Sequence, residues 1–572
     1  MSESRVSSPS HRQAPSHQQI PGQIPGQAPS HQQIPGQAFG PAISQDEFLY
    51  QSLSQTADQI DTHNVSPQQG NVAVQPGWWQ SLVPRSLRTG AVDVPITLEE
   101  TLYEALANSA QIRVFSQLPP IRKTAIVEAD SAFDWHQFLD VQWDDLSDPV
   151  GNTLTTGAGI DRFRDHHIYG SLGVRRRTRT GGQFEVSQRA GHQDNNSQFF
   201  VPGRQGTSQI TLGYTQPLLR GRGKVYNNSL VCLAQVDHAV SHDEYMRQLQ
   251  SHLLEVSRAY WSMYLERGVL YQKMQTYDRA QKIVHRLQLR RAVDASASQI
   301  KAAEAALTDR ESDLVRAFTA VKNAEARLRA LVNSPRFGDF ESLELIPVDV
   351  PSFDVMQVDL EHSVAQAIQQ RPEVKQAIKQ IKAASIRAGM AKHELMPVLN
   401  LITETYVAGL AAQGQVGQAW VNQFNQGEPG YSVGLQFEVP LGNRAAKARN
   451  ERRALELKQL RDQYQVTLQT VQLEVKVAVR EVETAKNELL SKQEVVRARE
   501  AQLDQLIQRW ERLPNETITT SLVLENILRA QEELASAEYE YLQSQITYNL
   551  SHVNLRKATG TLFQHQTVNV GQ

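Results

Sequence analysis

The fold is decided by a stretch that occurs in two related copies, Gln209-Ile-Thr-Leu-Gly-Tyr-Thr-Gln-Pro-Leu-Leu-Arg-Gly-Arg-Gly223 and Tyr431-Ser-Val-Gly-Leu-Gln-Phe-Glu-Val-Pro-Leu-Gly-Asn-Arg444. In each copy apolar and polar residues alternate up to Pro-Leu, and Gly and Arg then precede a long tract without proline. Such alternation is typical of a β-strand with one apolar and one polar face. Strands of this kind suit a barrel wall with lipid outside and water inside. The residues that define this strand-to-helix motif are Gln216, Pro217, Gly221, Pro440 and Gly442.

The duplication extends beyond the motif. Residues 97–112 parallel residues 359–374, and residues 303–307 parallel residues 530–534, in the same order along the chain. An ordered internal repeat indicates a duplicated unit. We expect each unit to run helix, strand, loop, strand, very long helix, helix. The predicted divisions are a disordered low-complexity extension at 1–92, a first repeat at 93–345, a second repeat at 355–563 and a C-terminal tail at 564–572.

Long tracts without proline predict unusually long helices. Residues 224–291 contain no proline, and a helix of that length would measure roughly 100 Å. A break near 293–296 precedes a second helix that ends near residue 332. Residues 446–510 form a similar tract, with apolar residues spaced by threes and fours as in a coiled coil. Helices this long must pair with each other and with other subunits to bury an apolar face.

The segment between the first two strands is rich in Gly, Arg, Asp and Asn. A strand is expected around 139–143, and we interpret residues 148–207 as a large loop or strand extension. Within it, residues 173–187 resemble a hairpin that turns at Gly181 and Gly182. The arginines Arg175, Arg176, Arg177 and Arg179 could bind lipid phosphates, although a solvated loop is the favoured interpretation.

Composition excludes several classes of protein. The net charge of -3 argues against nucleic acid as a partner, and a single cysteine, Cys232, rules out an intrachain disulfide. Because no run of 18 apolar residues occurs, the chain can cross a membrane only with strands. No complete catalytic motif is found, so we expect no enzyme and no cofactor. His166 and His167 could hold a metal, but neighbours in an extended segment point apart, so no metal site is expected.

The strand-Pro-Leu-Gly-Arg-helix motif, its repetition and the ending Leu555-Arg-Lys-Ala-Thr-Gly-Thr-Leu562 resemble the TolC-like outer membrane efflux protein family, over about residues 95–563. The resemblance implies a mainly α fold with a β-barrel part. Three copies would form a homotrimer in which each chain contributes four strands to one twelve-stranded transmembrane barrel. The long helices would continue as a coiled-coil α-barrel.

The resemblance also implies a function. It suggests a passive exit duct in the outer membrane, extending into the periplasm, for small molecules or proteins. The duct would serve a tripartite efflux or type I secretion system. Implied partners are a periplasmic adaptor (membrane fusion) protein, an inner-membrane RND, ABC or MFS transporter, and outer-membrane lipid.

Family members close their periplasmic entrance at the helical hairpin tips, which correspond here to residues 293–296 and 514–520. The candidate entrance residues are Val293, Asp294, Ser296, Glu525, Asn526 and Arg529. Well-studied members carry an aspartate pair that favours cations. Asn526 and Arg529 stand at those positions, beside Glu525, so an acidic ring is in doubt here. An ordinary solvated helix face is an equally good interpretation of these three residues.

Two alternatives remain open. A non-channel periplasmic coiled-coil scaffold fits the long helices but not the alternating strands, and a periplasmic adaptor would show one helical hairpin instead of two repeats.

Residues 1–90 contain no apolar core of a secretory signal, which leaves a processed chain, a start further upstream or an unusual export route. The histidines His11, His17 and His31 fit a low-complexity linker. We expect that residues 1–90 can be removed without loss of the trimer.

Overall fold

A computed structural model describes residues 76–88, 90–292, 295–338, 342–352, 358–512 and 517–562. The first half contains η1 (Trp78–Ser81), β1 (Val92–Ile96), α2 (Leu98–Asn108), α3 (Ala110–Ser116), α4 (Leu118–Asp130), η2 (Ser131–Phe133), β2 (Trp135–Pro149), α5 (Thr153–Thr156), β3 (Arg162–Arg177), β4 (Gln183–Asn195), β5 (Arg204–Pro217), α6 (Lys224–Asn227), α7 (Ser229–Leu289), η3 (Arg290–Ala292) and α8 (Ala297–Val332). The second half contains η4 (Pro335–Phe337), β6 (Leu343–Pro347), α9 (Leu360–Gln370), α10 (Pro372–Glu394), β7 (Val398–Ala412), α11 (Val416–Asn425), β8 (Pro429–Glu438), α12 (Arg444–Arg512) and α13 (Thr517–Thr559).

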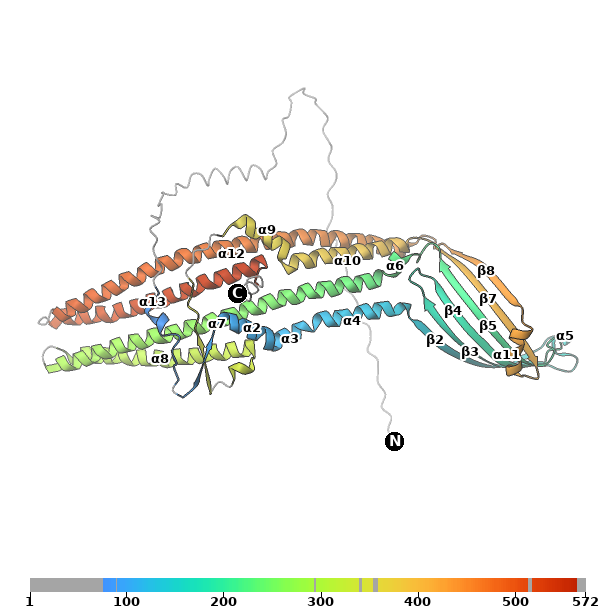
Figure 1. The fold of residues 1–572 in the computed structure, drawn as a ribbon, viewed down its shortest axis with the longest axis horizontal. Helices are drawn as coiled ribbons and strands as arrows, with labels where there is room; N and C mark the ends of the chain where they lie inside the picture. Colours follow the sequence, from blue (N-terminus) through green and yellow to red (C-terminus); the bar gives the residue numbers. More distant parts are fainter. Residues whose placement is uncertain are drawn as a thin grey trace, which may run out of the picture. The chain divides into compact units, whose positions relative to one another are not determined.

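The long predicted helices are confirmed. Helix α7 has 61 residues and α12 has 69, which correspond to roughly 90 and 100 Å of helix. Each turns back into a shorter partner, α8 or α13, and the two helical hairpins pack through α7 and α13 (Figure 1). No helix among the described residues is both long enough and apolar enough to cross a membrane. Both halves run from a short strand through helices and antiparallel strands to a long helix and its partner, but the first half has the additional strands β3 and β4, and the duplication itself stays a prediction.

The strands form one antiparallel sheet at the opposite end of the long helices from their hairpin tips, in the order β2-β3-β4-β5-β7-β8 (Figure 1). The expected four strands per chain are therefore wrong, because the sheet formed by the described residues has six. Residues 162–195, which we interpreted as part of a large loop or strand extension, form β3 and β4 between β2 and β5. The predicted hairpin turn is confirmed, and Gly181 adopts the φ of +96° that favours glycine there. A small separate sheet pairs β1 with β6 in parallel.

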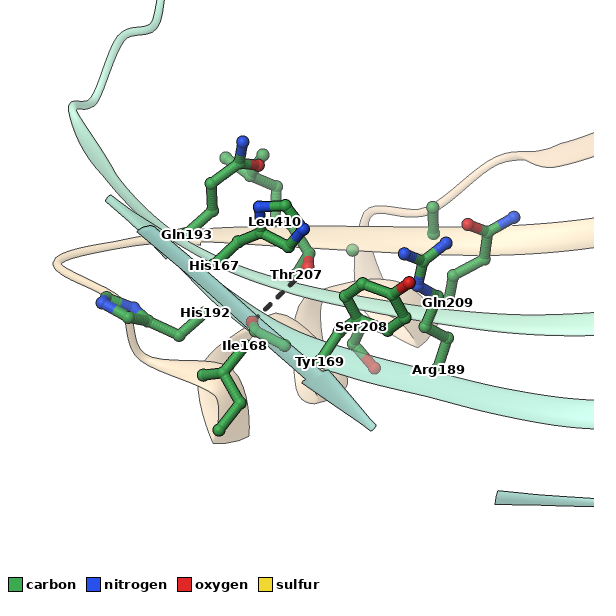
Figure 2. Close-up of a pocket in the computed structure, with 13 residues that line it drawn as sticks. His167, Ile168, Tyr169, Arg189, His192, Gln193, Thr207, Ser208, Gln209 and Leu410 are labelled. Carbon is green, nitrogen blue, oxygen red and sulfur yellow. Dashed lines mark hydrogen bonds between the residues drawn. The ribbon is translucent and has the colours of Figure 1, made fainter. Parts of the chain in front are cut away.

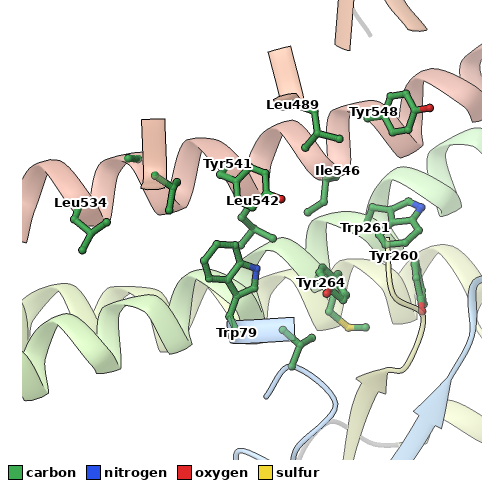
Figure 3. Close-up of a cluster of buried hydrophobic side chains, with 14 of the residues drawn as sticks. Trp79, Tyr260, Trp261, Tyr264, Leu489, Leu534, Tyr541, Leu542, Ile546 and Tyr548 are labelled. Carbon is green, nitrogen blue, oxygen red and sulfur yellow. The ribbon is translucent and has the colours of Figure 1, made fainter. Parts of the chain in front are cut away.

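The helices share a core rich in aromatic side chains. Figure 3 shows Tyr260, Trp261 and Tyr264 of α7 near Leu542 of α13. Trp79, from the segment before β1, enters the same core with only 1% of its surface exposed. Its ring meets Tyr541 edge to face, with 6.0 Å between centroids.

The segment 76–88, called the strap below, packs against the helices. Trp78 Nε1 donates to Glu538 Oε1 at 3.1 Å, and Gln80 Nε2 donates to Gln545 Oε1 at 3.3 Å. The prediction of a disordered extension at 1–92 is thus wrong from residue 76 onward, apart from Thr89, which lies outside the described residues. Two adjacent tryptophans supply the apolar area that the preceding Pro- and Gln-rich sequence lacks. Residues 1–75 also lie outside the described part of the chain.

Replacing Trp79 with alanine is expected to destabilise the helical region. Removing a buried tryptophan costs about 3–5 kcal/mol through lost burial and the cavity left behind. The expected result is a lower denaturation midpoint of the purified protein, followed by circular dichroism. Ser81→Ala, at an exposed position of the same turn, is the matched control. A chain that lacks residues 1–90 should be destabilised like Trp79→Ala, which revises the expectation that this removal is harmless. An unchanged midpoint for Trp79→Ala would contradict the packing of the strap.

Glu538 lies in the same core with none of its side chain exposed. Burial raises the pKa of Glu538, while Arg279 and the hydrogen bond from Trp78 lower it to a smaller extent. A carboxyl whose pKa is raised on folding adds stability below its ordinary pKa, and that stability is lost as pH rises through the raised value.

Glu538→Gln is therefore expected to raise the unfolding temperature at pH 8, and the gain should shrink toward pH 4. Thermal unfolding measured across this pH range checks the prediction. Glu540→Gln on the exposed side of the same helix is the control, because it removes a surface ion pair with Lys492 and should bring no gain. A gain for Glu538→Gln that does not depend on pH would refute the titration argument.

Candidate channel surfaces

The strand-to-helix motif forms a tight turn in both copies. After Pro217 the chain leaves the sheet, and Gly221 and Gly223 take φ values of +86° and +95° that only glycine adopts freely. Asn227 Nδ2 donates to the carbonyl oxygens of both glycines, at 2.8 and 2.9 Å, which fixes the start of the helical segment. Gln216 is held within the strand end, where its Oε1 accepts from Tyr214 Oη at 2.6 Å.

The second copy of the motif is built in a similar way. Pro440 follows β8, and Gly442 has a φ of +83° directly before Asn443, at +43°. Asn443 Nδ2 donates to the carbonyl oxygen of Leu395 at the end of α10, at 3.3 Å. The motif therefore shapes both passages from sheet to long helix, and its residues have a structural explanation.

The turn of the β3–β4 hairpin (residues 178–182) docks onto the first of these junctions. The backbone N–H of Gly223 donates to the carbonyl oxygen of Thr180 at 3.0 Å. A Cβ added to Gly181 would lie 2.3 Å from the carbonyl oxygen of Gly221, so the approach requires glycine. The hairpin is therefore fixed to the helical end of the sheet.

The arginine cluster strengthens this attachment. Arg177 donates to Asn227 Oδ1 at 2.8 Å, and Arg179 forms an ion pair with Asp130 at 2.6 Å. Arg176 Nε donates to the carbonyl oxygen of Phe133 at 2.7 Å, and the Arg175 guanidinium lies 5.5 Å from the centre of the Phe138 ring. The interpretation of a loop is wrong, because these arginines lie on a strand and a docked turn, but their side chains are exposed to solvent as expected. Lipid phosphate is not needed to explain them.

The two adjacent histidines point to opposite sides of β3, as expected. His166 Nδ1 lies 2.6 Å from Asp145 Oδ1, and His167 Nε2 lies 2.7 Å from Asp144 Oδ2, on the other face. Within the described ranges, no group of three or more His, Cys, Asp or Glu side chains is placed to hold a metal ion.

One face of the sheet is polar and hollowed. A hollow of about 430 Å³ is lined by residues of β3, β4, β5 and β7, and Figure 2 shows the side chains around it. The Arg189 guanidinium lies over Tyr169, at 3.8 Å from the centre of its ring. The rings of His167 and Tyr169 are stacked, with 5.7 Å between their centres. Gln193 and Gln209 also line the hollow. Charged, amide and aromatic groups together suit a surface that contacts water and polar solutes.

The opposite face is apolar and exposed. The registers place its residues side by side across strands, as in the pairs Leu139–Leu172 and Leu401–Leu435. Leu435 is 69% exposed although it belongs to a continuous apolar surface. Other exposed members of this face are Val141, Trp143, Ile168, Val174, Leu212, Tyr431, Val433 and Phe437. A surface of this extent indicates an apolar environment or partner around the sheet.

Helix α11 covers one part of the apolar face, where that face turns polar. Gln423 is fully buried there, and its Oε1 accepts from Ser208 Oγ at 2.8 Å and from Gln188 Nε2 at 3.2 Å. The helix thus satisfies polar groups that would otherwise interrupt the apolar surface. Its own Trp420 and Phe424 remain exposed and pack edge to face at 5.3 Å. The apolar character of this side of the sheet continues across the helix.

The tips of the two helical hairpins lie beside each other. Arg286 of α7 forms an ion pair with Glu511 of α12 at 2.8 Å, and the guanidinium of Arg290 lies 5.7 Å from the Trp510 ring. Sequence reasoning missed these four residues, because the ion pair joins positions 225 residues apart. The contacts place the ends of α7 and α12 at the same level.

The candidate entrance residues occupy this region only in part. Val293 and Asp294 lie outside the described residues. Ser296 caps α8, where its side chain accepts from the backbone of Gln299, so a structural role accounts for it. Glu525, Asn526 and Arg529 are exposed on α13, and Arg529 pairs with Glu525 at 3.3 Å. Their role at an entrance stays a prediction.

Comparison with known proteins supports the fold. No protein-family model matches the chain, and no curated protein matches it by sequence. Among solved structures, the outer membrane protein VceC from Vibrio cholerae aligns with a TM-score of 0.58 at 16% identity, over 81% of this chain and 96% of its own.

Two outer membrane channels align in the same way. The CmeC outer membrane channel of Campylobacter jejuni has a TM-score of 0.58 at 14% identity, over 82% of this chain and 86% of its own. The open MtrE outer membrane channel of Neisseria gonorrhoeae has a TM-score of 0.55 at 15% identity, over 81% and 89%. The chain therefore has the fold of these outer membrane channels, as its resemblance to TolC-like proteins implied.

Proposed function

We propose that the chain is an outer-membrane exit duct that extends into the periplasm, assembles as a homotrimer and acts without catalysis. The observation that carries the proposal is the two-faced sheet joined to helices of roughly 100 Å. The sheet exposes leucines and valines on one face and a hollowed polar surface on the other. Lipid outside and water inside account for both faces. The fold shared with VceC, CmeC and MtrE supports the same function.

The proposed partners follow from this arrangement. A duct in the outer membrane needs energy from elsewhere, so we propose a periplasmic adaptor coupled to an inner-membrane transporter. The system would be of the tripartite efflux or type I secretion kind. A periplasmic scaffold or adaptor accounts for the helices, but it gives the exposed apolar sheet no role.

Planar bilayer recording tests the proposal. Purified protein added to one side should produce discrete, long-lived steps of ionic current. A Gly181→Val variant, whose hairpin turn cannot dock on Gly221, should give fewer insertions at equal protein concentration. A well-folded oligomer that never produces current steps would count against a channel.

Arg529→Asp is expected to raise the preference of the pore for cations. Arg529 now balances Glu525 at 3.3 Å, so the change replaces a neutral pair with two negative charges in each chain. At a separation near 4 Å such charges act on a passing ion with about 1 kcal/mol even in water, which corresponds to roughly fivefold in the permeability ratio. Reversal potentials in asymmetric salt measure the ratio.

Arg247→Asp, in the part of α7 far from its tip and paired with Glu244, makes the same charge change away from the tips and is the control. If selectivity and conductance stay unchanged in Arg529→Asp, the Glu525–Arg529 face points away from the pore.

A further inference from the structure

The β3–β4 hairpin is built into the sheet along its full length. Strand β3 pairs with β2 from Arg176–Trp135 to Arg162–Pro149, and β4 pairs with β5 from Gln183–Thr215 to Asp194–Arg204. β2 and β5 therefore do not touch, although a shorter chain could have paired them directly.

The hairpin also continues both faces of the sheet. Leu172 of β3 stands between Leu139 of β2 and Gln188 of β4 on the apolar side, and Gln188 is the position that α11 covers. On the polar side, Tyr169 and Arg189 of the hairpin form the floor of the hollow (Figure 2). If the hairpin lay outside the barrel, nothing would explain why it has apolar residues on one face and polar residues on the other, in line with the rest of the sheet.

The sheet has two free edges, β2 and β8. Six strands are too few to close a barrel, because the smallest membrane barrels have eight, and an unpaired edge cannot face lipid. β2 must therefore pair with β8 of a neighbouring copy. Every pairing from β2 to β8 is antiparallel, and six strands alternate in direction, so the junction between copies is antiparallel as well. Strand direction therefore alternates all the way around the closed barrel.

We propose that the hairpin belongs to the barrel wall and that three copies enclose an eighteen-stranded barrel. This inference rests on the proposed trimeric duct. Barrel diameter grows roughly in proportion to strand number, so the lumen would be about 1.5 times as wide as that of a twelve-stranded barrel. Barrels of this size leave an aqueous channel. The polar lining and the width point to bulky hydrophilic cargo.

Cross-strand cysteines test the position of the hairpin. Cys232 is the only cysteine, so a Cys232→Ser chain provides a clean background. Three double variants are compared in the membrane-inserted protein: Leu139→Cys with Leu172→Cys for β2–β3, Val186→Cys with Leu212→Cys for β4–β5, and Leu401→Cys with Leu435→Cys for β7–β8 as the positive control. Facing residues lie about 4.5–5.5 Å apart between Cα atoms, within reach of a short bismaleimide. Native mass spectrometry counts the copies against a chain mass of 64.2 kDa.

The expected result is efficient crosslinking of all three pairs in an assembly of three chains. Crosslinking of the β7–β8 control alone, in a trimer that still conducts, would overturn the hairpin's place in the wall and leave the proposed duct intact. Crosslinking of all pairs in an assembly of two chains would overturn the eighteen-stranded barrel in favour of twelve strands. Crosslinked single chains without current would refute the duct itself and the barrel with it.

Discussion

Replacing Leu435 with arginine should prevent stable insertion of the sheet into a membrane. Leu435 lies on the apolar face of the edge strand β8, between Tyr431 and Phe437 and paired with Leu401, and 69% of its surface is exposed. An arginine at the lipid face near the centre of a bilayer costs about 2–4 kcal/mol. Three copies would place three such charges in lipid, so a loss of roughly 6–12 kcal/mol per assembly is expected.

The measurement is the fraction of protein that floats with liposomes in a density gradient. Gln436→Arg is the matched control, because Gln436 is the next residue on the same strand and faces the polar side, where it accepts from Asn400. The control should insert nearly as well as the natural chain. Equal insertion of both variants would mean that the two faces of β8 do not separate lipid from water.

The second large effect is expected at Arg267 in α7. Arg267 and Glu344 are each 1% exposed and form an ion pair at 2.7 Å. Arg267 Nε also donates to the carbonyl oxygen of Val83 in the strap, at 3.1 Å, and Glu344 accepts from the backbone N–H of Arg88 at 2.9 Å. The pair therefore ties the strap to both α7 and β6.

Arg267→Met is expected to destabilise the helical region by about 3–5 kcal/mol, because it leaves a buried carboxylate without its partner. Burial alone would raise the pKa of Glu344, but the pKa is lowered overall by Arg267 and the backbone N–H groups of the strap. Stability from a lowered carboxyl pKa is present above the ordinary value and is lost as pH falls through the lowered value. The loss in Arg267→Met should therefore be largest at neutral pH and smaller in acid.

Denaturant unfolding at two pH values measures this effect. The double variant Arg267→Met with Glu344→Gln is the control, since it removes the charge as well as its partner, and it should recover part of the loss. A double variant as unstable as Arg267→Met would show that the packing of Arg267, and not its charge, carries the effect.

Local sequence signals predicted the helices and the strand-to-helix turns. The absence of proline from 224 to 291 and from 446 to 510 predicted the long helices, because proline in the interior of a helix breaks or kinks it. Pro-Leu followed by Gly and Arg predicted where each strand passes into a long helix, and Gly221 and Gly442 adopt positive φ at these two places. Each of these signals lies within one continuous segment and can be recognised without the rest of the chain.

The missed features depend on partners that are distant in sequence. The apolar alternation of β4 is interrupted by Gln188, whose amide is satisfied by Gln423, 235 residues away. From sequence alone, a polar residue at this position breaks the alternating pattern of a strand, so the segment was interpreted as a large loop or strand extension. Trp79 was missed for a similar reason, because the neighbouring sequence is rich in Pro and Gln and gives no sign that this residue packs on Tyr541. The ion pair between Arg286 and Glu511 likewise becomes visible only when both hairpin tips are placed.

The most direct test of the central claim is a cryo-electron microscopy map of the full chain in lipid nanodiscs. The account predicts three copies around one continuous lumen, with the faces that carry Leu139 and Leu435 against the lipid belt and the hollow beside Tyr169 and Arg189 toward the lumen. The long helices should extend away from one side of the disc. A map in which the sheets lie outside the lipid belt, or in which the copies enclose no lumen, would contradict the account.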